Sequence, residues 1–355
     1  MIYSKTENPT VSIAIPVYNE SVHIEQLIQG FLLTKYPNLI EIFVADGGSS
    51  DGTQEIIKQL SMKDQRVKLI HNIQKIQSAG LNLILKECTG DIFIRADAHS
   101  DYAPDYIERC VEALLVSKAK NVGGSQRFVA KTPFQAGVAL AARSLLGNGG
   151  AKYRNPDYSG YADTVYLGCF WKKDLIALGT YQNNNITNED AELNQQFKKI
   201  HKNAVYIDSK IRVWYYPRST WKSLFIQYFK YGRGRYLTSA KYLQDSQIRG
   251  KLPFFTFVII FTLCCLAIFF KSFRLPLKAI ILFGLIISSW ESLRITWKFN
   301  RNFSREIWRG SEEDIPSFVS RFFFCEIVLI TMPLAHFYGY AYQLFRHKIL
   351  RISSW

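Results

Sequence analysis

The feature that most limits the fold of this chain is an apolar run near its C-terminus, residues 252–270 (LPFFTFVIIFTLCCLAIFF), which contains no charged side chain. A helix of about 20 such residues crosses the hydrocarbon core of a bilayer, which is about 30 Å thick. Two further apolar runs follow at 276–290 and 322–345, and each contains at least one ionisable residue. The sequence therefore predicts a membrane-associated region over residues 251–355, with two or three hydrophobic helices.

The segment just before these runs, residues 211–250, is basic and aromatic. Eight Lys or Arg residues stand against one acid between Arg212 and Arg249, with Trp, Tyr and Phe interleaved. Such a segment suits an anionic cytoplasmic leaflet, where each Lys or Arg contributes about 1 kcal/mol. Basic and aromatic residues also occur together in nucleic-acid-binding proteins. The adjacent apolar run favours membrane-interface helices, so membrane lipid is the predicted partner and nucleic acid is not.

The charges also predict an orientation. Positive residues remain on the cytoplasmic side, which places residues 1–250 in the cytoplasm, at the inner (plasma) membrane of the cell. Three spans would put the basic tail (RHKILRISSW) on the opposite side. Either the third apolar segment is re-entrant or interfacial, or some of these helices lie in the membrane plane.

The N-terminal part reads as an α/β domain over residues 1–210. Short apolar runs at 10–16, 40–45, 67–71 and 91–96 alternate with segments of helical periodicity. Strands and helices that alternate at this spacing build a mostly parallel sheet with helices on both faces. Ligands of open α/β sheets bind beyond the carboxyl ends of the strands. Three polar clusters, at residues 16–20, 46–53 and 97–101, are therefore expected to meet at one edge.

The cluster at 46–53 (DGGSSDGT) has a turn-forming composition. A tight strand-to-helix loop explains this composition as well as a ligand-binding loop does. Its glycines allow a ligand to approach the backbone closely. The carboxylate of Asp46, at the strand end, can accept a hydrogen bond from a ring N–H or a ribose hydroxyl. The loop matches neither the Walker A nor the GxGxxG pattern, which disfavours an NTPase or a dehydrogenase.

Two acid-containing motifs offer catalytic chemistry. Asp97-x-His99 (ADAH) can supply one or two ligands to Mg²⁺ or Mn²⁺, with phosphate oxygens and water completing the shell. The imidazole tilts the choice towards Mn²⁺. The alternative without a metal is that Asp97 caps a helix and His99 is a loop residue.

The second motif is NEDAEL (188–193). Acids in the first turn of a helix suit the helix dipole, and a carboxylate there can equally act as a general base.

Taken in order, five segments make the chain resemble a family 2 glycosyltransferase with a GT-A fold. The resemblance covers roughly residues 9–240. It is greatest to the membrane-associated subgroup that includes a succinoglycan glucosyltransferase. The matching segments are IPVYNE (15–20), VADGGSSDGT (44–53), SAGLNLIL (78–85), GDIFIRADAHSDY (90–102) and NEDAEL (188–193).

The resemblance implies roles for residues on the nucleotide side of the site. Pro16, Tyr18 and Glu20 would line the nucleotide pocket, with Glu20 near the ribose. Asp46 would recognise the base, which is uracil in a UDP-sugar. Asp51 would be a supporting residue of the binding site, or its role in the loop would be purely structural.

The resemblance also implies the chemistry. Asp97 and His99 would bind the metal, Mg²⁺ or Mn²⁺, and the donor diphosphate. Asp190 would deprotonate the acceptor hydroxyl, which attacks the anomeric carbon in line, so that an α-linked donor gives a β-linkage by inversion. The expected function is a metal-dependent hexosyltransferase that uses a nucleotide-sugar, UDP-hexose, in exopolysaccharide biosynthesis.

The chain departs from the family pattern in two places. His99 replaces the second Asp of the usual DxD motif, which leaves the identity of the metal open. The Q-x-x-R-W element of processive members is absent after Gln227. A non-processive enzyme is therefore expected, acting on a lipid-linked acceptor such as a polyprenyl-diphosphate saccharide.

Arg233 or Arg235 would contact the acceptor diphosphate or membrane lipid, or would serve only as an interfacial anchor. The alternatives are a polyprenyl-phosphate sugar synthase and a non-catalytic nucleotide-sugar-binding scaffold.

Overall fold

The computed structural model describes residues 8–182, 189–241 and 252–352, and their contacts divide the chain into two units. The first unit comprises residues 1–127 and 152–215, and the second comprises 128–151 and 216–355. The chain therefore leaves the first unit after Arg127 and returns to it at Lys152. This division differs from the predicted domains, because residues 128–151 belong with the C-terminal part and the later boundary lies at 215 rather than 210.

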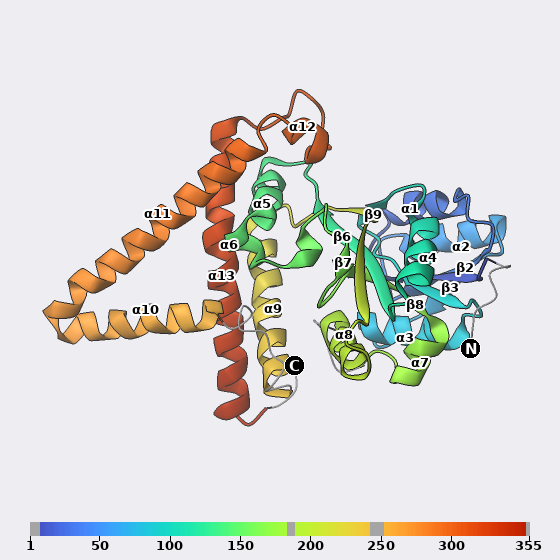
Figure 1. The fold of residues 1–355 in the computed structure, drawn as a ribbon, viewed down its shortest axis with the longest axis horizontal. Coiled ribbons are helices and arrows are strands. Elements are labelled where there is room, and N and C mark those ends of the chain that lie inside the picture. Colours follow the sequence, from blue (N-terminus) through green and yellow to red (C-terminus); the bar gives the residue numbers. More distant parts are fainter. Residues whose placement is uncertain (1–7, 183–188, 242–251, 353–355) are drawn as a thin grey trace. The chain divides into compact units, whose positions relative to one another are not determined.

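The first unit is built on one mixed sheet (Figure 1). Its strands follow the order β3-β2-β1-β4-β8-β6-β9-β5, with β7 paired to β9. The four strands expected from the sequence are the parallel ones, whereas β8 runs antiparallel to β4 and to β6. The sheet is thus mixed, and the strands predicted from the sequence form its parallel part. The strands are β1 (Val11–Val17), β2 (Leu39–Asp46), β3 (Val67–His71), β4 (Ile92–Arg95), β5 (Ser100–Tyr102), β6 (Asn121–Phe128), β7 (Gly160–Tyr161), β8 (Tyr166–Trp171) and β9 (Val205–Tyr215).

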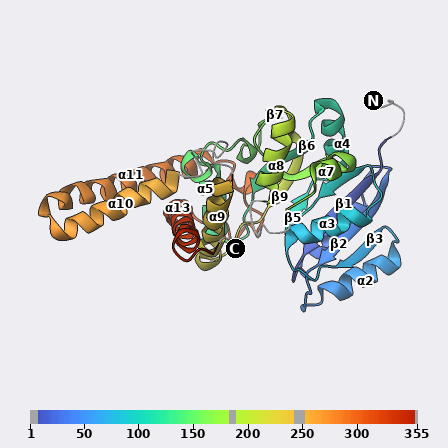
Figure 2. The same cartoon turned by 90° about the horizontal axis from the view of Figure 1, so that it is seen from below.

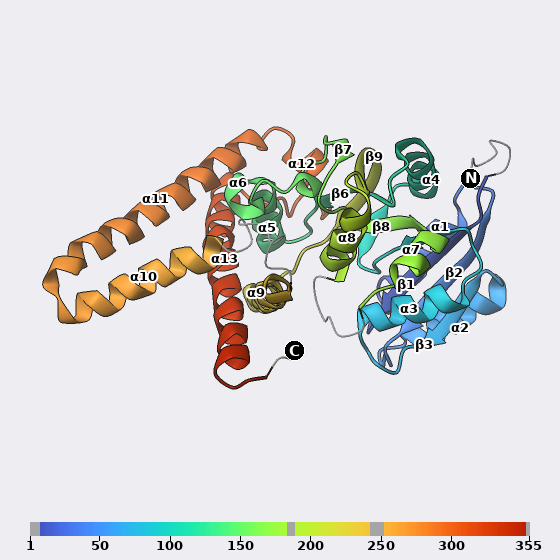
Figure 3. The same cartoon turned by 60° about the horizontal axis from the view of Figure 1, so that its bottom comes forward.

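Helices cover both faces of this sheet, as predicted. One apolar core joins β1 and β2 to α1 (Ile24–Leu32), α2 (Thr53–Lys63) and α4 (Tyr106–Ser117). The stripe Ile24, Leu27, Ile28 and Phe31 faces this core at the helical period. The second core contains residues of α3 (Gln77–Glu87), α7 (Lys172–Leu178) and α8 (Glu189–Ile200), which lie in front of the strands in Figure 3.

Strand β1 positions the site because its two neighbouring strands pair with it over different lengths. Its ladder with β4 ends at the pair Ala14–Arg95, while its ladder with β2 continues to Val17–Asp46. Pro16 therefore lies beyond the last pair with β4, where its missing N–H costs no bond to that strand. The strand order reverses between β1 and β4, so their carboxyl ends form the switch point at which α/β sheets bind ligands.

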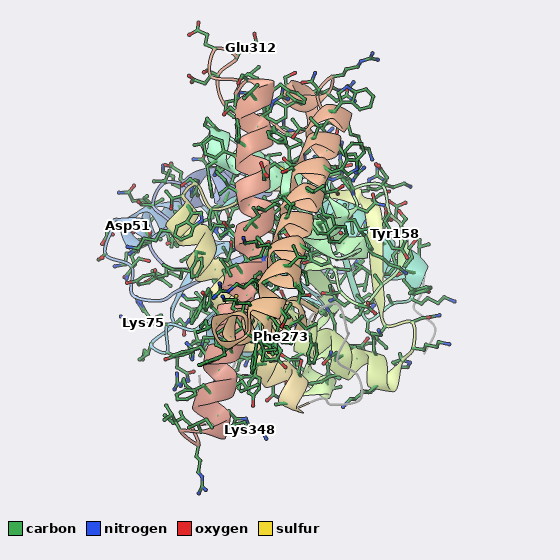
Figure 4. All side chains as sticks on the ribbon, turned by 90° about the vertical axis from the view of Figure 1, so that its left-hand side faces the viewer. Asp51, Lys75, Tyr158, Phe273, Glu312 and Lys348 are labelled. Carbon is green, nitrogen blue, oxygen red and sulfur yellow. The ribbon has the colours of Figure 1, made fainter. Side chains whose placement is uncertain are left out.

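The second unit is helical. Among the described residues, two helices are long and apolar enough to cross a membrane, at Lys271–Lys298 and Phe318–Lys348, and α10 is a shorter apolar helix. Helices α10 and α11 meet at the short turn of Lys271–Phe273 (Figures 1 and 2). In Figure 4, Glu312 lies just before α13 and Lys348 lies at its far end. The helices are α5 (Pro133–Arg143), α6 (Leu145–Asn148), α9 (Trp221–Lys241), α10 (Leu252–Phe269), α11 (Arg274–Lys298), α12 (Phe303–Glu306) and α13 (Phe318–Lys348).

The basic, aromatic helix α9 packs along α13. The two backbones approach so closely that a Cβ on Gly339 would lie 1.9 Å from the carbonyl oxygen of Phe229. Arg233 donates from Nε to Gln343 Oε1 (2.9 Å), and its guanidinium lies over the ring of Tyr342. Arg233 is thus engaged within the second unit. The predicted role of Arg235 stays a prediction, and residues 242–251 of the predicted interface segment lie outside the described residues.

Candidate active site

Two of the three predicted polar clusters interlock beyond the ends of β1 and β2. Asn19 adopts a left-handed conformation (φ 56°), which Asn tolerates better than most residues. Its N–H donates to Ser49 Oγ (2.7 Å), and its side-chain oxygen accepts from the N–H of Ser50 (2.9 Å). The N–H of Glu20 donates to Thr53 Oγ1 (2.9 Å). The two loops therefore form one continuous surface at the sheet edge.

Asp51 has a structural role within this surface. One carboxylate oxygen accepts the N–H of Ser21 (3.0 Å), and the other accepts the N–H (3.1 Å) and hydroxyl of Thr53. These bonds, that from the Thr53 hydroxyl foremost, hold the pKa of Asp51 well below its usual range. The side chain thereby fixes the start of α2 to the segment that precedes α1.

Asp46 is also engaged within its own loop. It is buried, and its Oδ2 accepts from the N–H of Gly48 (2.9 Å) and from Gln54 Nε2 (2.7 Å). Its Oδ1 accepts from Ser49 Oγ at 2.5 Å. A carboxylate offers about four lone-pair sites, so the loop uses most of this acceptor capacity. Recognition of a nucleobase by Asp46 stays a prediction. It requires Gln54 or Ser49 to give up its hydrogen bond to Asp46.

An exposed aromatic ring flanks this loop. Tyr18 is 57% exposed, and a Cβ on Gly47 would lie 3.4 Å from its ring. Lys75 also lies beside the glycines, with Nζ 3.6 Å from the Cβ position of Gly48. Asp51 and Lys75 are both labelled in Figure 4. An aromatic face, a glycine backbone and a cation together suit the ring and phosphates of a nucleotide.

Three carboxylates meet on one buried guanidinium at the end of β4. Arg95 is 4% exposed. Its Nη1 contacts Glu189 Oε1 (3.2 Å) and bonds to Asp190 Oδ1, and its Nη2 lies 3.4 Å from Asp97 Oδ1. Gln77 Nε2 donates to the same oxygen of Asp97 (3.2 Å). The cluster therefore joins two predicted site residues, Asp97 and Asp190, through a residue that the sequence analysis did not single out.

The cluster is acidic in total, with three carboxylates against one guanidinium. Partial burial raises the pKa of Asp190 to about 7. Arg95 opposes this rise, whereas Glu189 and Asp97 add to it. A carboxylate with a pKa near 7 can both accept and release a proton at neutral pH, which is what a general base requires.

His99 and Glu20 come together across the switch point between β1 and β4. Their Nδ1 and Oε1 atoms are 3.5 Å apart, and the His99 ring lies 5.7 Å from that of Tyr215. The turn is fixed by Tyr102, whose hydroxyl accepts the N–H of Asp97 (2.7 Å) and donates to its carbonyl oxygen (3.1 Å). The side chains predicted for the ribose and for the metal are therefore neighbours.

The donor set suits a metal that is shared with a substrate. In the described part of the chain, no three His, Cys, Asp or Glu side chains form a group that could hold a metal ion on their own. Asp97 and His99 supply two possible ligands. Mg²⁺ in such sites takes one or two protein ligands and completes its octahedron with water and substrate phosphates. The two residues therefore fit a divalent cation bound together with a diphosphate.

Sequence reasoning missed Arg95, Glu189 and Tyr181. Arg95 did carry a signal, because a charged residue inside a buried strand (IFIR) needs partners. Tyr181 is buried, and its hydroxyl has no hydrogen-bond partner among the described residues. Burial, followed by the charge of Asp190, raises the pKa of Tyr181. Nothing in the local sequence marks this tyrosine, and Asn188 of NEDAEL lies outside the described residues.

Comparison with known sequences gives matches over most of the chain. The profile described as "Glycosyl transferase family 2" matches residues 12–171. The succinoglycan biosynthesis protein ExoA of Rhizobium meliloti (strain 1021) is 37% identical over 243 residues, which are 68% of this chain and 73% of that protein. A dolichyl N-acetyl-alpha-D-glucosaminyl phosphate 3-beta-D-2,3-diacetamido-2,3-dideoxy-beta-D-glucuronosyltransferase of Methanococcus voltae is 27% identical over 240 residues, covering 65% and 74%.

A solved structure shares the fold over almost the whole chain. The mannosyltransferase PcManGT of Pyrobaculum calidifontis, in complex with GDP-Man and Mn²⁺, superposes with a TM-score of 0.56. The alignment covers 97% of this chain and 89% of that one, at 15% sequence identity. At this identity the likeness concerns the arrangement of helices and strands.

Proposed function

Because the chain belongs to glycosyl transferase family 2, we propose that it transfers a hexose from a UDP-sugar to a lipid-linked saccharide during surface polysaccharide synthesis. The observation that carries this proposal is the cluster at the end of β4. There Arg95 holds Asp97, a candidate ligand for the metal and diphosphate, close to Asp190, a candidate base. A glycosyl transfer with inversion needs these two functions side by side.

The interlocked loops after β1 and β2 support a nucleotide at the switch point. The ring of Tyr18 offers a face for the base, and Pro16 precedes it where β1 separates from β4. Glu20 lies beside His99, so the same carboxylate can reach a ribose hydroxyl at the diphosphate end. Asp46 and Asp51 keep the loop in shape, and Asp46 is proposed to contact uracil when a donor binds.

In the proposed reaction, Asp190 accepts the proton of the acceptor hydroxyl as its oxygen attacks the anomeric carbon. A C–O bond forms to the acceptor while the bond from the anomeric carbon to the diphosphate oxygen breaks. The electron pair leaves with the nucleoside diphosphate, and the configuration inverts. General-base catalysis of this kind contributes about 10²- to 10⁴-fold.

Asp97 and His99 would hold the divalent cation, Mg²⁺ or Mn²⁺. A bound cation supplies neutralisation of the negative charge that builds on the departing diphosphate. The excess of carboxylates over cations around Arg95 supports a further positive charge at this place. The imidazole of His99 favours Mn²⁺.

A lipid-linked acceptor at the cytoplasmic face of the inner membrane is supported by the second unit. It contains two helices long and apolar enough to cross a bilayer, together with the basic, aromatic helix α9. The relative from Methanococcus voltae is named for transfer to a dolichyl-phosphate-linked sugar. We propose a polyprenyl-diphosphate saccharide as the acceptor.

The first experiment assays membranes that contain this chain with a panel of radiolabelled UDP-sugars, with and without EDTA. Label is expected in the lipid extract for one donor, and EDTA is expected to abolish it. Label in no extract with any donor would contradict the proposal, and would favour the non-catalytic scaffold if calorimetry still shows that UDP binds.

The second experiment compares Asp97→Ala and Asp190→Asn with the control Asp174→Asn. Asp174 pairs with Lys120 (2.9 Å), outside the acid cluster, so its variant should remain active. Both site variants should lose transfer by at least about 10²-fold. Full activity in either variant would refute that residue's role. Wild-type turnover of Asp190→Asn on polyprenyl phosphate would instead favour a polyprenyl-phosphate sugar synthase, because an ionised acceptor needs no base.

A further inference from the structure

Arg95 lies at the centre of the acid cluster but takes no part in the bond making and bond breaking of the proposed reaction. It ends β4, with its backbone paired to Ala14 of β1 on one side and to Gly168 of β8 on the other. Its backbone is therefore held by a neighbouring strand on each side. Its side chain is almost fully buried, and a buried charge persists only where counter-charges and hydrogen bonds compensate its desolvation.

The guanidinium faces two elements at once. Nη1 contacts the first turn of α8 through Glu189 and Asp190, and Nη2 contacts Asp97, which lies two residues after the end of β4. Arginine suits this task because its planar fork presents several donors in fixed directions. A lysine at the same place has one nitrogen and cannot span the two groups with the same geometry.

The contact with Asp190 uses one carboxylate oxygen. Among the described residues, Oδ1 accepts the bond from Arg95, and no bond to Oδ2 is found. A carboxylate held through one oxygen presents the other in a defined direction. The guanidinium thus provides for Asp190 what a base requires, which is an oriented acceptor lone pair.

We propose that Arg95 is a positioning residue that holds the carboxylate of Asp190 beside Asp97, so that the base and the diphosphate site keep a fixed separation. The inference rests on the proposed function, since it assigns Arg95 a role through Asp190. Two rival roles make different predictions. If Arg95 instead binds the donor diphosphate, its loss weakens donor binding, and if it serves only the fold, its loss lowers stability without a specific effect on turnover.

The test compares Arg95→Lys with Arg127→Lys in the full-length protein. Arg127 is a matched control in the same unit, because its Nη2 donates to the main-chain carbonyls of Pro156 (3.0 Å) and Ser209 (2.8 Å) rather than to the carboxylates of the acid cluster. We expect Arg95→Lys to lower kcat by about 10²-fold, a share of the general-base contribution. The Kd for the UDP-sugar, measured by calorimetry, should be unchanged, and Arg127→Lys should retain the wild-type kcat.

A second pair of variants keeps the test informative if the single substitution impairs folding. Arg95→Met combined with Glu189→Gln removes one positive and one negative charge together, so fewer carboxylates are left without a partner. The same pair is then made in an Asp190→Asn background. If Arg95 acts through Asp190, the loss of kcat in the combined variant should equal the loss from Asp190→Asn alone, because residues that act as a unit are not additive.

Two results would overturn the inference. Losses that multiply in the combined variant, or a Kd for the donor that rises in step with the fall in kcat, would each show that Arg95 does not act through Asp190. Failure of the proposed function is distinguishable from both. In that case Asp190→Asn itself retains full transfer, or the wild-type protein transfers no sugar at all.

Discussion

At the scale of single residues, the site depends on how charge is compensated at the end of β4. Asp190 gains its raised pKa from burial and from two neighbouring acids, and Arg95 keeps that pKa from rising further. The balance leaves a carboxylate that changes protonation close to neutral pH. Asp51 is the opposite case, because hydrogen bonds from Thr53 and Ser21 lower its pKa and favour the ionised form.

The pKa of Asp190 predicts a pH dependence of transfer. The base must be deprotonated to act, so kcat/KM should fall as the pH drops below about 7. Each unit below the apparent pKa should lower kcat/KM by about tenfold, since the active fraction falls by that factor. The measurement is a pH–rate profile at limiting acceptor concentration, with donor binding followed in parallel. A flat profile between about pH 5.5 and 8 would contradict this assignment.

Glu41 is a buried acid on β2, away from the acid cluster around Arg95. It accepts hydrogen bonds from Ser12 Oγ (2.7 Å) and Thr89 N–H (2.8 Å), and it pairs with Lys68 (2.9 Å). Burial would raise its pKa, but the bonds from Ser12, Thr89 and Lys68 outweigh that effect and lower the pKa to about 2. Its ionised form thus stabilises the folded state.

Glu41→Gln should therefore destabilise the first unit by about 1–3 kcal/mol, because a neutral amide cannot satisfy the same donors. The contribution of Glu41 is fully present above the unfolded pKa of about 4.3 and is lost as the pH falls towards 2. Denaturant unfolding at pH 7 and pH 3 measures both effects. The difference between wild type and variant should shrink at the lower pH, and a constant difference would refute the explanation.

At the scale of elements, close contact between α9 and α13 depends on two glycines. A Cβ on Gly232 would lie 2.1 Å from the carbonyl oxygen of His336, and one on Gly339 would lie closer still to that of Phe229. The helices run in the same direction, as the bonds Trp221–Thr331 and Arg233–Gln343 show. The basic, aromatic helix is thus fixed along a candidate membrane span.

Gly339→Ala should force the two helices apart and lower the free energy of unfolding by about 1–3 kcal/mol. Gly284→Ala in α11 is the matched control, because no heavy atom from outside its own stretch of helix backbone lies within 4 Å of its Cβ position. Thermal unfolding in detergent should show a lower Tm for the first variant and an unchanged or higher Tm for the second. Equal Tm values for the two variants would contradict the close approach.

The elements that could be predicted from the sequence are those that short-range patterns of apolar and turn-forming residues indicate. The four parallel strands, the helices between them and the helix that begins in NEDAEL follow from periodicity and turn chemistry, and the structure confirms them. The antiparallel half was missed, because β6 (NVGGSQRF) contains glycine and polar residues and is defined by its distant partners. The uncharged run 252–270 forms α10, which is a shorter apolar helix than α11 and α13.

Within the site, the sequence could indicate residue types at the strand ends but not their contacts. Asp97, His99, Glu20 and Asp190 were predicted from motifs, and the structure brings them to one sheet edge in two neighbouring pairs. That Arg95 joins Asp97 to Asp190 is a three-dimensional fact, because 95 residues separate Arg95 from Asp190 along the chain. Their catalytic roles remain predictions.

At the scale of the whole molecule, the two units are interleaved in the sequence. Residues 128–151 leave the first unit, and α5 packs against α13, where a Cβ on Gly137 would lie 2.6 Å from Cβ of Phe324. Arg143 of the same helix pairs with Glu306 (2.8 Å). A single boundary drawn along the sequence therefore does not separate the first unit from the second.

A chain shortened to residues 1–215 should consequently be poorly soluble, because it retains α5 without the helix that covers it. Replacing residues 129–151 of that shortened chain by a Gly/Ser linker should restore solubility, since the first unit then retains only its own elements. Sedimentation of the two shortened chains after expression distinguishes them. Equal solubility of both would show that α5 needs no cover.

The same interleaving has a consequence for biosynthesis. Gly137 leaves the ribosome long before its contact Phe324, and at about 5–20 residues per second the delay is on the order of 10 to 40 s. For that time the apolar side of α5 has no protein partner. The second unit is therefore completed only late in translation, once α13 has been made, so that covering α5 becomes one of the last steps of folding.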